Sequence, residues 1–320
     1  MQPSRTLWLD ADPGLDDWLT LLLLTAQECL RCAGMGVVAG NAPLETTLDN
    51  ALRIRALHGL QLPIHAGAAH PLNLQLQTAQ HILGAQGMRT TGPELEHTLQ
   101  PCDGRDAVAA LLQHLRQSSA PTTLVATGPL TNVAQALQTD REAMNGVSEI
   151  VWMGGSTDVG NQTPVAEFNA FADPEALAMV LASGLPIRMF GLNLCRQLLL
   201  TREHVQALKA LPGPVAACVA GYVEAYQRIR SADGSEPMPL YDPVVALWLM
   251  QPDLFEFRPL HVEVELEGHL TRGMTVCDMR RKPSKVANVQ VAMHVQAQDA
   301  MALFMQKLTG VLAAGALQRH

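Results

Sequence analysis

The chain has 320 residues, of which 48% are hydrophobic and 16% are charged, so it can bury a large core and is not an intrinsically disordered protein. Its formal net charge is −8, from 22 basic and 30 acidic residues, and it contains no long basic run. This balance argues against nucleic acid or an anionic membrane surface as the main partner and favours a small-molecule ligand.

Cysteine usage and the start of the chain bear on where the protein works. Six cysteines, at positions 29, 32, 102, 195, 218 and 277, are scattered through a chain too large to need disulfide bonds, which indicates a reducing compartment. Cys29 and Cys32 lie where we expect a helix to end, without a second CxxC motif or a nearby histidine, so we interpret them as incidental thiols. Residues 1–5 lead into a strand without a signal peptide, and the apolar run 18–24 is too short to span a bilayer. We therefore expect a cytoplasmic protein.

Short apolar runs typical of buried strands alternate with helical patterns over the first 195 residues. We expect strands at 6–9, 35–39, 62–65, 123–126, 149–153 and 186–190, and helices at 105–118, 131–139 and 174–183. This alternation predicts an α/β protein with a mostly parallel, doubly wound (Rossmann-like) open sheet flanked by helices.

After residue 195 the pattern of expected elements changes. We expect helices at 201–210, 214–230, 242–250 and 298–312, and half-exposed strands at 259–267 and 287–295. No internal repeat and no linker rich in Pro, Gly and Ser interrupts the sequence. We therefore predict a single domain over 1–320, with a helical excursion around 201–240 covering the site.

Four carboxylates lie within the eight residues that follow the first strand, and this crowding is the strongest clue to function. They are Asp10, Asp12, Asp16 and Asp17, arranged around a Pro-Gly turn. Like charges held within about 4–6 Å of one another raise each other's pKa values and oppose folding, so a bound cation is the natural remedy. Because the candidate ligands are all hard oxygens, Ca²⁺ or Mg²⁺ fits better than Zn²⁺. The alternative, a helix start whose carboxylates are merely solvated, suits one Asp pair better than four carboxylates.

Polar residues also follow the other predicted strands. In doubly wound sheets ligands bind outside the carboxyl ends of the strands, so these residues are expected to line one crevice. They are Asn41, Thr127, Asn161, Glu167, Asn169 and Asn193, together with the backbone around Gly154. Such a lining suits a polyhydroxylated ligand held against a divalent cation.

The motifs of the whole chain resemble those of the nucleoside hydrolases, the calcium-dependent N-ribohydrolases that cleave a nucleoside into ribose and base. The resemblance rests on Asp10-Ala-Asp-Pro-Gly-Leu-Asp-Asp17, Ala39-Gly-Asn41, Gly67-Ala-Ala-His-Pro-Leu72, Ala126-Thr-Gly-Pro-Leu-Thr-Asn132, Met153-Gly-Gly155, Val165-Ala-Glu-Phe-Asn169 and Leu266-Glu-Gly-His-Leu-Thr-Arg-Gly-Met-Thr275. Each motif is weak alone, and their joint presence in the family's order is a strong signal.

The resemblance implies a role for each residue of this crevice. It implies Ca²⁺ ligands at Asp12, Asp17, the carbonyl of Thr127 and Asp242, with Asp10 orienting the loop behind them. It implies ribose and substrate contacts at Asp16, Asn41, Met153, Asn161, Glu167, Asn169, Tyr226, Arg230 and Asp242. In this scheme calcium lowers the pKa of its bound water, and Asp12 accepts the proton as general base. Relatives are commonly dimers or tetramers, so the resemblance also implies a homodimer or homotetramer.

The chain departs from the family pattern where the base would bind. Tyr241 stands where the best-known branch has a histidine that protonates the leaving base, and it can act as a catalytic acid, stack on the base or be a structural wall. Leu83 stands where pyrimidine-preferring relatives tend to have histidine, and we expect the adjacent His81 to point elsewhere. Tyr222, Tyr226 and Arg230 share one face of a helix by i, i+4 spacing. The sequence thus leaves the purine or pyrimidine preference open.

Two other functions compete with a ribonucleoside hydrolase. A phosphohydrolase of the haloacid dehalogenase type also begins with paired aspartates after a strand, but it expects a Thr-rich turn where this chain has Pro13-Gly14. A non-catalytic ribose- or nucleoside-binding relative would keep the metal site and lack leaving-group activation, which the residues at 83 and 241 allow.

Overall fold

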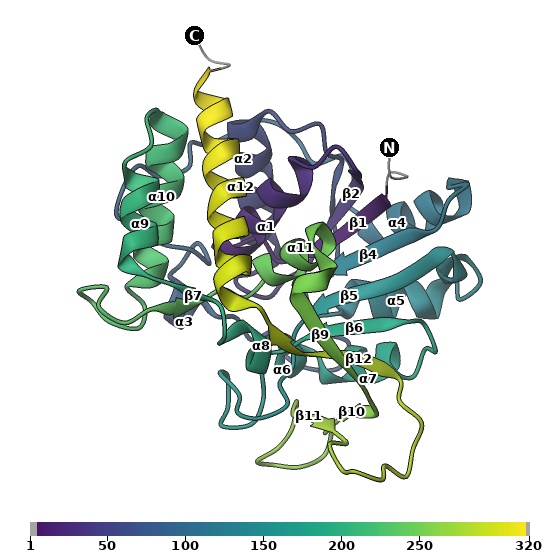
Figure 1. Cartoon of the computed structure of the whole chain (residues 1–320). Helices are drawn as coiled ribbons and strands as arrows, with labels where there is room; N and C mark the ends of the chain where they lie inside the picture. Colours follow the sequence, from purple (N-terminus) through teal and green to yellow (C-terminus); the bar gives the residue numbers. More distant parts are fainter. Residues whose placement is uncertain (1–4, 318–320) are drawn as a thin grey trace.

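The computed structural model describes residues 5–317, and within that range eight strands form one central sheet (Figure 1). Their order is β3 (Ile64–Ala66), β2 (Leu30–Val37), β1 (Arg5–Ala11), β4 (Thr122–Ala126), β5 (Val147–Met153), β6 (Ile187–Phe190), β12 (Val289–Val295) and β9 (Phe255–Leu260). All neighbours run parallel except β9, which is antiparallel to β12. The predicted fold class is confirmed. Residues 1–4, where we expected no targeting segment, lie outside the described residues.

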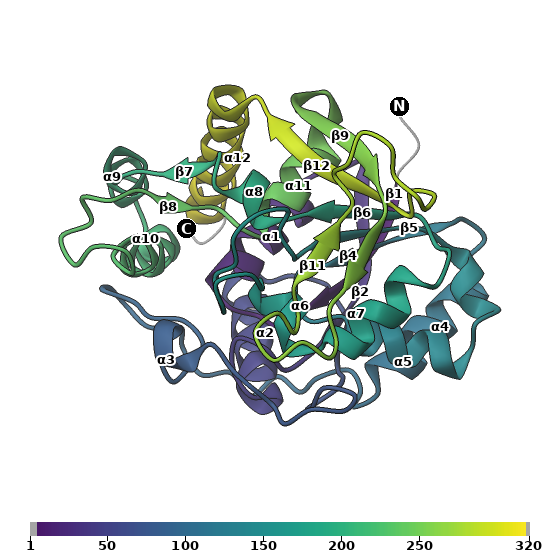
Figure 2. The ribbon, with the colours of Figure 1, turned by 90° about the horizontal axis from the view of Figure 1, so that it is seen from below.

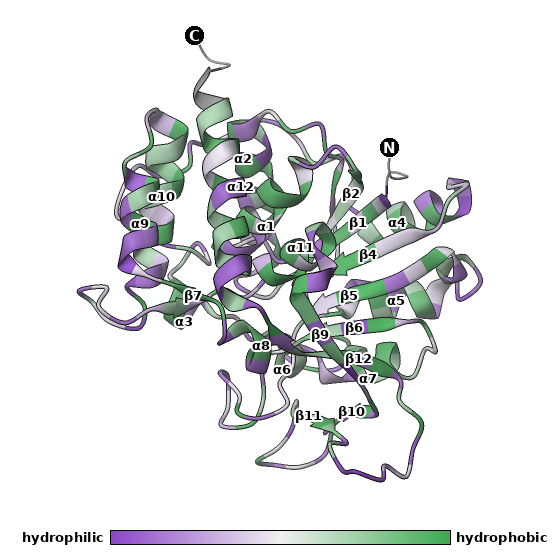
Figure 3. Cartoon of the chain, in the orientation of Figure 1, coloured by the Kyte–Doolittle hydropathy of each residue, from purple (hydrophilic) through white to green (hydrophobic). Residues whose placement is uncertain are grey.

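Helices cover both faces of the sheet, as parallel strands require. One layer contains α1 (Leu15–Thr25), α2 (Leu44–His58), α11 (Pro243–Met250) and α12 (Ala297–Leu317), and the other contains α4 (Ala107–Gln117), α5 (Thr131–Thr139) and α7 (Pro174–Leu181). Nearly every residue of α11 is buried, which explains why its sequence is apolar on all sides. Figure 3 shows hydrophobic residues along much of the sheet and on α11, whereas α9 (Arg202–Lys209) is largely hydrophilic. No helix among residues 5–317 is long and apolar enough to cross a bilayer.

A helical segment occupies the region of the excursion predicted around 201–240, and its role as a cover for the site stays a prediction. The strands β7 (Leu199–Leu200) and β8 (Met238–Pro239) pair antiparallel and enclose α9 and α10 (Pro214–Gln227). Figures 1 and 2 place α9 and α10 at one side of the molecule, beside α12 and away from α4 and α5. The amide of Thr91 donates to the carbonyl of Gly221 in α10 (3.1 Å), which ties the segment after α3 (Gln80–Leu83) to this excursion.

Some predicted boundaries were wrong for identifiable reasons. The first helix ends at Thr25, so Cys32 lies inside β2 and not near a helix end. Strand β2 was predicted too short because residues 31–33 are partly exposed and the next residue is Gly34, which packs directly against the ring of Trp8. The segment 259–267 divides between β9 and β10 (Val262–Val264), and β10 pairs with β11 (Thr275–Cys277) in a separate hairpin. Helix α2 was not predicted.

Candidate active site

A cavity of about 460 Å³ opens at the carboxyl ends of β1, β4 and β5. This is the expected place, because the strand order reverses between β1 and β4, where the crossover connections leave a crevice. Predicted site residues that line the cavity are Asp12, Asp16, Asn41, Thr127, Met153, Asn161, Glu167, Asn169, Tyr226, Arg230, Tyr241 and Asp242. Asp10 and Asp17 are not among the lining residues and lie behind them. Asn193, which we also expected in the crevice, does not line it and donates to the Ala292 carbonyl in β12. The structure thus brings nearly the whole predicted set together.

Asp12 occupies a tight backbone cradle. Its carboxylate accepts a hydrogen bond from the amide of Asn41 (2.6 Å), and its backbone carbonyl accepts one from the Asn41 side chain (3.0 Å). A Cβ atom at Gly40 or Gly128 would overlap this carboxylate, so both glycines provide room for it. The side chain is 1% exposed and still borders the cavity, which leaves it fixed and directed at a ligand.

Asp17 and Asp10 hold the segment between β1 and α1 in place from the side away from the cavity. Asp17 accepts hydrogen bonds from the Gly14 amide (2.9 Å) and the Thr127 hydroxyl (2.6 Å), which joins the start of α1 to the end of β4. Asp10 accepts one from Asn132 (3.0 Å), while its other carboxylate oxygen is buried without a partner among the described residues. That Asp10 orients the loop stays a prediction.

Asp16 is held from across the cavity by α10. The Tyr226 hydroxyl donates to Asp16 Oδ2 (2.9 Å), and Pro239 offers it a second acceptor (3.1 Å). Asp16 Oδ1 is buried and has no partner among the described residues, so this oxygen is free to accept from a ligand hydroxyl. Tyr226 therefore orients an acidic group that borders the cavity, in addition to walling the cavity with its ring.

Glu167 and Asn169 organise the opposite wall. Glu167 caps α6 (Phe168–Ala172) by accepting from the amides of Asn169 and Ala170, and it also accepts from the Gly155 amide (2.8 Å). The Asn169 side chain donates to the carbonyls of Thr127 (2.8 Å) and Met153 (3.0 Å). The Thr127 carbonyl, a predicted metal ligand, is thus already a hydrogen-bond acceptor in this structure.

The residues where the sequence departs from the family pattern lie at or near the cavity. Tyr241 and Leu83 line it, whereas His81 is exposed and is not among the lining residues. Tyr222 is buried, packs edge-on against Trp18 (5.4 Å between ring centroids) and accepts a hydrogen bond from the Leu95 amide. Helix α10 ends at Gln227, so the prediction that Arg230 shares a helical face with Tyr222 and Tyr226 was wrong; Arg230 is exposed and lines the cavity from beyond the helix end.

Burial governs the electrostatics of the site. It raises the pKa of Asp16 to about 7, that of Glu167 to about 7 and that of Asp17 to about 6. For Asp12 and Asp242, burial raises the pKa values strongly, and repulsion from Asp17 raises them further. The site therefore concentrates acidic groups that cannot all be charged without a compensating cation.

Comparison with known proteins identifies the family. The model of the inosine-uridine preferring nucleoside hydrolases matches residues 7–302. The chain belongs to this family. It is 38% identical over 308 residues to the pyrimidine-specific ribonucleoside hydrolase RihA of a Shewanella species (strain MR-7), covering 95% of this chain and 96% of the relative. It is also 38% identical over 312 residues to RihA of Photobacterium profundum, covering 95% and 99%.

Solved structures agree with this assignment. The purine-preferring ribonucleoside hydrolase from Gardnerella vaginalis superposes with a TM-score of 0.87 at 27% identity, covering 97% of this chain and all of that chain. This nucleoside hydrolase therefore hydrolyses the N-glycosidic bond of nucleosides to give ribose and free base. The non-catalytic alternative is not favoured, and neither is the phosphohydrolase.

The acidic residues of this nucleoside hydrolase offer the oxygen donors that a hard divalent cation prefers. Within residues 5–317 no group of three or more Asp, Glu, His or Cys side chains is arranged closely enough to hold a metal ion as it stands. The available donors are nevertheless carboxylate and carbonyl oxygens, the carboxylates repel one another, and Asp16 has an unpartnered buried oxygen. Oxygen donors of this kind suit Ca²⁺ or Mg²⁺.

Sequence reasoning missed two residues that shape the site, Asn132 and Arg196, and one side-chain role, that of the Thr127 hydroxyl. Asn132 supports Asp10, the Thr127 hydroxyl supports Asp17, and Arg196 lines the cavity. Thr127 follows β4 and Asn132 lies at the start of α5, in a motif whose pattern indicates no side-chain role for either residue. Arg196 follows α8 (Leu192–Cys195), and its sequence context carries no comparable signal.

Proposed function

We propose that this nucleoside hydrolase is a calcium-dependent ribonucleosidase that prefers pyrimidine ribonucleosides. The observation that carries the proposal is the buried, oxygen-only acidic wall of the cavity, formed by Asp12, Asp16 and Asp242 with Asp17 behind it. Calcium would be held by Asp12, Asp17, the Thr127 carbonyl and Asp242. When bound, it supplies positive charge that lowers the pKa of a coordinated water.

Asp12 is the proposed general base. Its carboxylate borders the cavity and is fixed by the Asn41 amide, so it can accept a proton from the attacking water without first reorienting. Cleavage of an N-glycosidic bond passes through an oxocarbenium-like state, in which positive charge develops on the sugar. The acidic wall stabilises this charge more strongly than the neutral ground state.

The ribose contacts follow from the two walls. Asp16 offers its free Oδ1 to the 2′ and 3′ hydroxyls, while Asn161, Glu167 and Asn169 lie on the opposite side for the 3′ and 5′ groups. Asn41 and Met153 also line the cavity, and Asn41 hydrogen-bonds Asp12, one of the residues that would hold calcium. Such contacts tighten as the ring flattens, which makes the sugar the main recognition element.

The base would lie between the aromatic and apolar residues at the cavity mouth. Leu83, Tyr226 and Tyr241 provide a surface on which a base can stack, and Arg230 can donate to a base carbonyl. The pyrimidine preference rests on the RihA relatives, whose names specify pyrimidine ribonucleosides and which are the more similar in sequence. Assembly as a homodimer or homotetramer and a cytoplasmic location remain part of the proposal.

A substrate panel tests the proposal directly. Purified protein is given uridine, cytidine, inosine and p-nitrophenyl riboside, each with Ca²⁺ and with a chelator, and reducing sugar is measured. We expect turnover of uridine and cytidine with Ca²⁺, a lower kcat/KM for inosine, and loss of turnover with chelator. Faster hydrolysis of inosine would contradict the pyrimidine preference, and turnover of p-nitrophenyl riboside alone would show that the site lacks leaving-group activation.

Tyr226→Phe tests the role of Asp16. The variant keeps the ring and removes the hydroxyl that donates to Asp16 Oδ2, so kcat/KM for ribonucleosides is expected to fall by about tenfold or more, as for a lost bond to a charged group. Tyr222→Phe is the matched control, because that hydroxyl contacts the Leu95 amide and no acidic group. Equal losses in the two variants would remove Tyr226 from this role.

A further inference from the structure

The loop between β5 and α6 carries Asn161 into the cavity. Asn161 Oδ1 accepts a hydrogen bond from the Phe168 amide (2.9 Å), and its Nδ2 has no protein partner among the described residues. This amide nitrogen is therefore available to donate to a ligand hydroxyl oxygen. The position of the donor depends on what fixes the loop around it.

The second half of this loop is held by its own backbone. The Gly160 amide donates to the Pro164 carbonyl (3.0 Å), and the Asn161 amide donates to the Ala166 carbonyl (3.1 Å). A Cβ atom at Gly160 would overlap the backbone at Thr163 and Ala166, so the turn closes tightly at this glycine. This turn is a compact unit, and its placement relative to the sheet must come from elsewhere.

The first half of the loop is anchored through Ser156. The Thr275 hydroxyl in β11 donates to the Ser156 carbonyl (2.6 Å) and accepts from the Ser156 amide (2.8 Å). The Ser156 hydroxyl in turn donates to Asp158 Oδ1 (2.7 Å), which also accepts from the Val159 amide (2.7 Å). Asp158 is thus the point at which the anchored part of the loop meets the part that carries Asn161.

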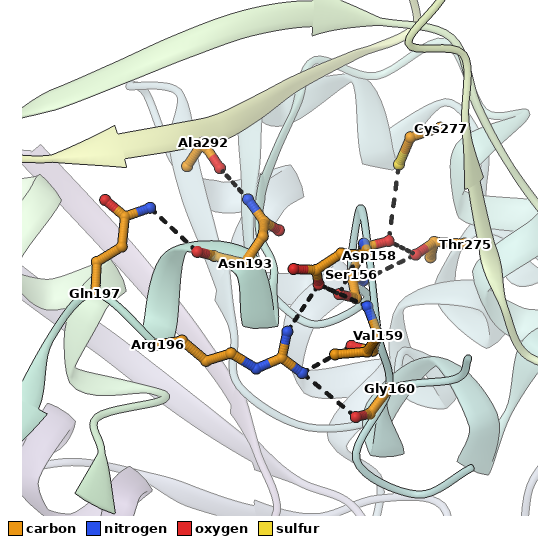
Figure 4. A network of polar contacts seen from close by, with 10 residues as sticks. All are labelled: Ser156, Asp158, Val159, Gly160, Asn193, Arg196, Gln197, Thr275, Cys277 and Ala292. Atoms are coloured by element: carbon orange, nitrogen blue, oxygen red, sulfur yellow. Dashed lines mark hydrogen bonds and ion pairs between the residues drawn. The ribbon is translucent and has the colours of Figure 1, made fainter. Parts of the chain in front are cut away.

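Arg196 hydrogen-bonds this junction through both terminal nitrogens of its guanidinium group, a contact that we call the Arg196 grip (Figure 4). Nη1 donates to Asp158 Oδ1 (2.7 Å), and Nη2 donates to the carbonyls of Val159 (2.8 Å) and Gly160 (3.3 Å). The Gly160 carbonyl belongs to the peptide group that joins Gly160 to Asn161. Within residues 5–317, Arg196 is the one side chain from outside the loop that hydrogen-bonds residues 157–160.

The backbone around Arg196 is itself held in place by its neighbours. Asn193 in α8 donates to the Ala292 carbonyl in β12 (3.0 Å), and Gln197 donates to the carbonyls of Asn193 (3.1 Å) and Met293 (2.9 Å) (Figure 4). Gln197 also accepts from the Val295 amide (3.2 Å). These bonds, on both sides of Arg196 in the sequence, fix its backbone to the central sheet. The guanidinium group therefore holds the loop in a defined position relative to the sheet.

We propose that Arg196 is a positioning residue that sets Asn161 against the 5′ hydroxyl of the ribose, and thereby determines selectivity for substrates that carry this hydroxyl. The inference rests on the proposed function, which places Asn161 on the 3′ and 5′ side of the sugar. Both terminal nitrogens of Arg196 are engaged by the loop, so its proposed role is to position Asn161 and not to bind the sugar. The planar fork of the guanidinium group matters here, because the single ammonium nitrogen of a lysine cannot hold these acceptors in the same two-nitrogen geometry.

The test compares uridine with 5′-deoxyuridine. Arg196→Met keeps the aliphatic stem and removes the grip, while Arg202→Met removes the same charge from an exposed arginine of α9 that contacts Asp233. We expect Arg196→Met to lower kcat/KM for uridine by about tenfold and for 5′-deoxyuridine by about twofold or less, because only the first substrate uses the Asn161 bond. Arg202→Met should leave the ratio of the two substrates at its wild-type value.

A double-substitution cycle separates positioning from general destabilisation. If Arg196 acts through Asn161, then Asn161→Ala with Arg196→Met should be no slower on uridine than Asn161→Ala alone. Equal losses of kcat/KM on both substrates, or additive losses in the double-substitution cycle, would overturn the inference. The proposed function would still stand in that case, provided that the wild type hydrolyses uridine. If Arg196→Met does not fold, Asp158→Asn weakens the same grip, and it must give the same selective loss. Absence of ribonucleoside turnover by the wild type would overturn both.

Discussion

Asp12→Asn is expected to lower kcat on ribonucleosides by at least about a thousandfold, which is within the range that loss of a general base produces. An amide of the same shape can still accept from the Asn41 amide with its oxygen, so the cradle formed with Gly40 and Gly128 is preserved. What is lost is the ability to accept a proton and the negative charge offered to a cation. The measurement is single-turnover and steady-state release of reducing sugar from uridine at saturating Ca²⁺.

Asp173→Asn provides the matched control. Asp173 is also fully buried, but it lies outside the cavity, where it caps α7 and accepts from Thr131 and the Leu72 amide. Its substitution should lower thermal stability while folded protein keeps its kcat. If Asp12→Asn retained more than a few per cent of wild-type kcat with unchanged stability, another residue would have to be the base.

The sequence predicted the parts of the site that depend on local order. The acidic cluster follows directly from a strand, a Pro-Gly turn and a helix start, and the polar residues at other strand ends meet it because parallel strands end at one edge of the sheet. The resemblance to the family then predicts different roles for Asp10, Asp12 and Asp16.

Contacts between distant segments could not be predicted in this way. The bond from Tyr226 to Asp16 joins residues 210 positions apart, and the grip of Arg196 on Asp158 spans 38 positions. Their existence depends on how the excursion folds back on α1 and how α8 is fixed to β12. Periodicity and spacing describe one segment at a time, so they predict which elements form but not which side chains meet across them. The same limit hid the true start of β2 at Leu30, which pairs with Arg5 at the start of β1.

Removal of divalent metal is expected to destabilise the protein, and more so as the pH rises. In the metal-free form, burial raises the pKa of Asp16 to about 7, that of Asp17 to about 6 and that of Glu167 to about 7, whereas the unfolded chain titrates these groups near 4. A raised pKa in the folded state means that folding takes up protons, so the contribution of these three groups to the stability of the metal-free protein is greatest below about pH 4 and falls until the pH passes their folded-state pKa values.

Bound Ca²⁺ should reverse this trend, because it binds the charged forms of the carboxylates and stabilises only the folded state. Thermal unfolding of chelator-treated and Ca²⁺-loaded protein between about pH 5 and pH 8 measures the difference. We expect the gap in Tm to be small at pH 5, to widen toward pH 8, and to close again when Ca²⁺ is restored together with activity. A gap independent of pH would mean that the acidic wall does not hold the metal, and a Tm unaffected by chelator would mean that the site needs no cation to fold.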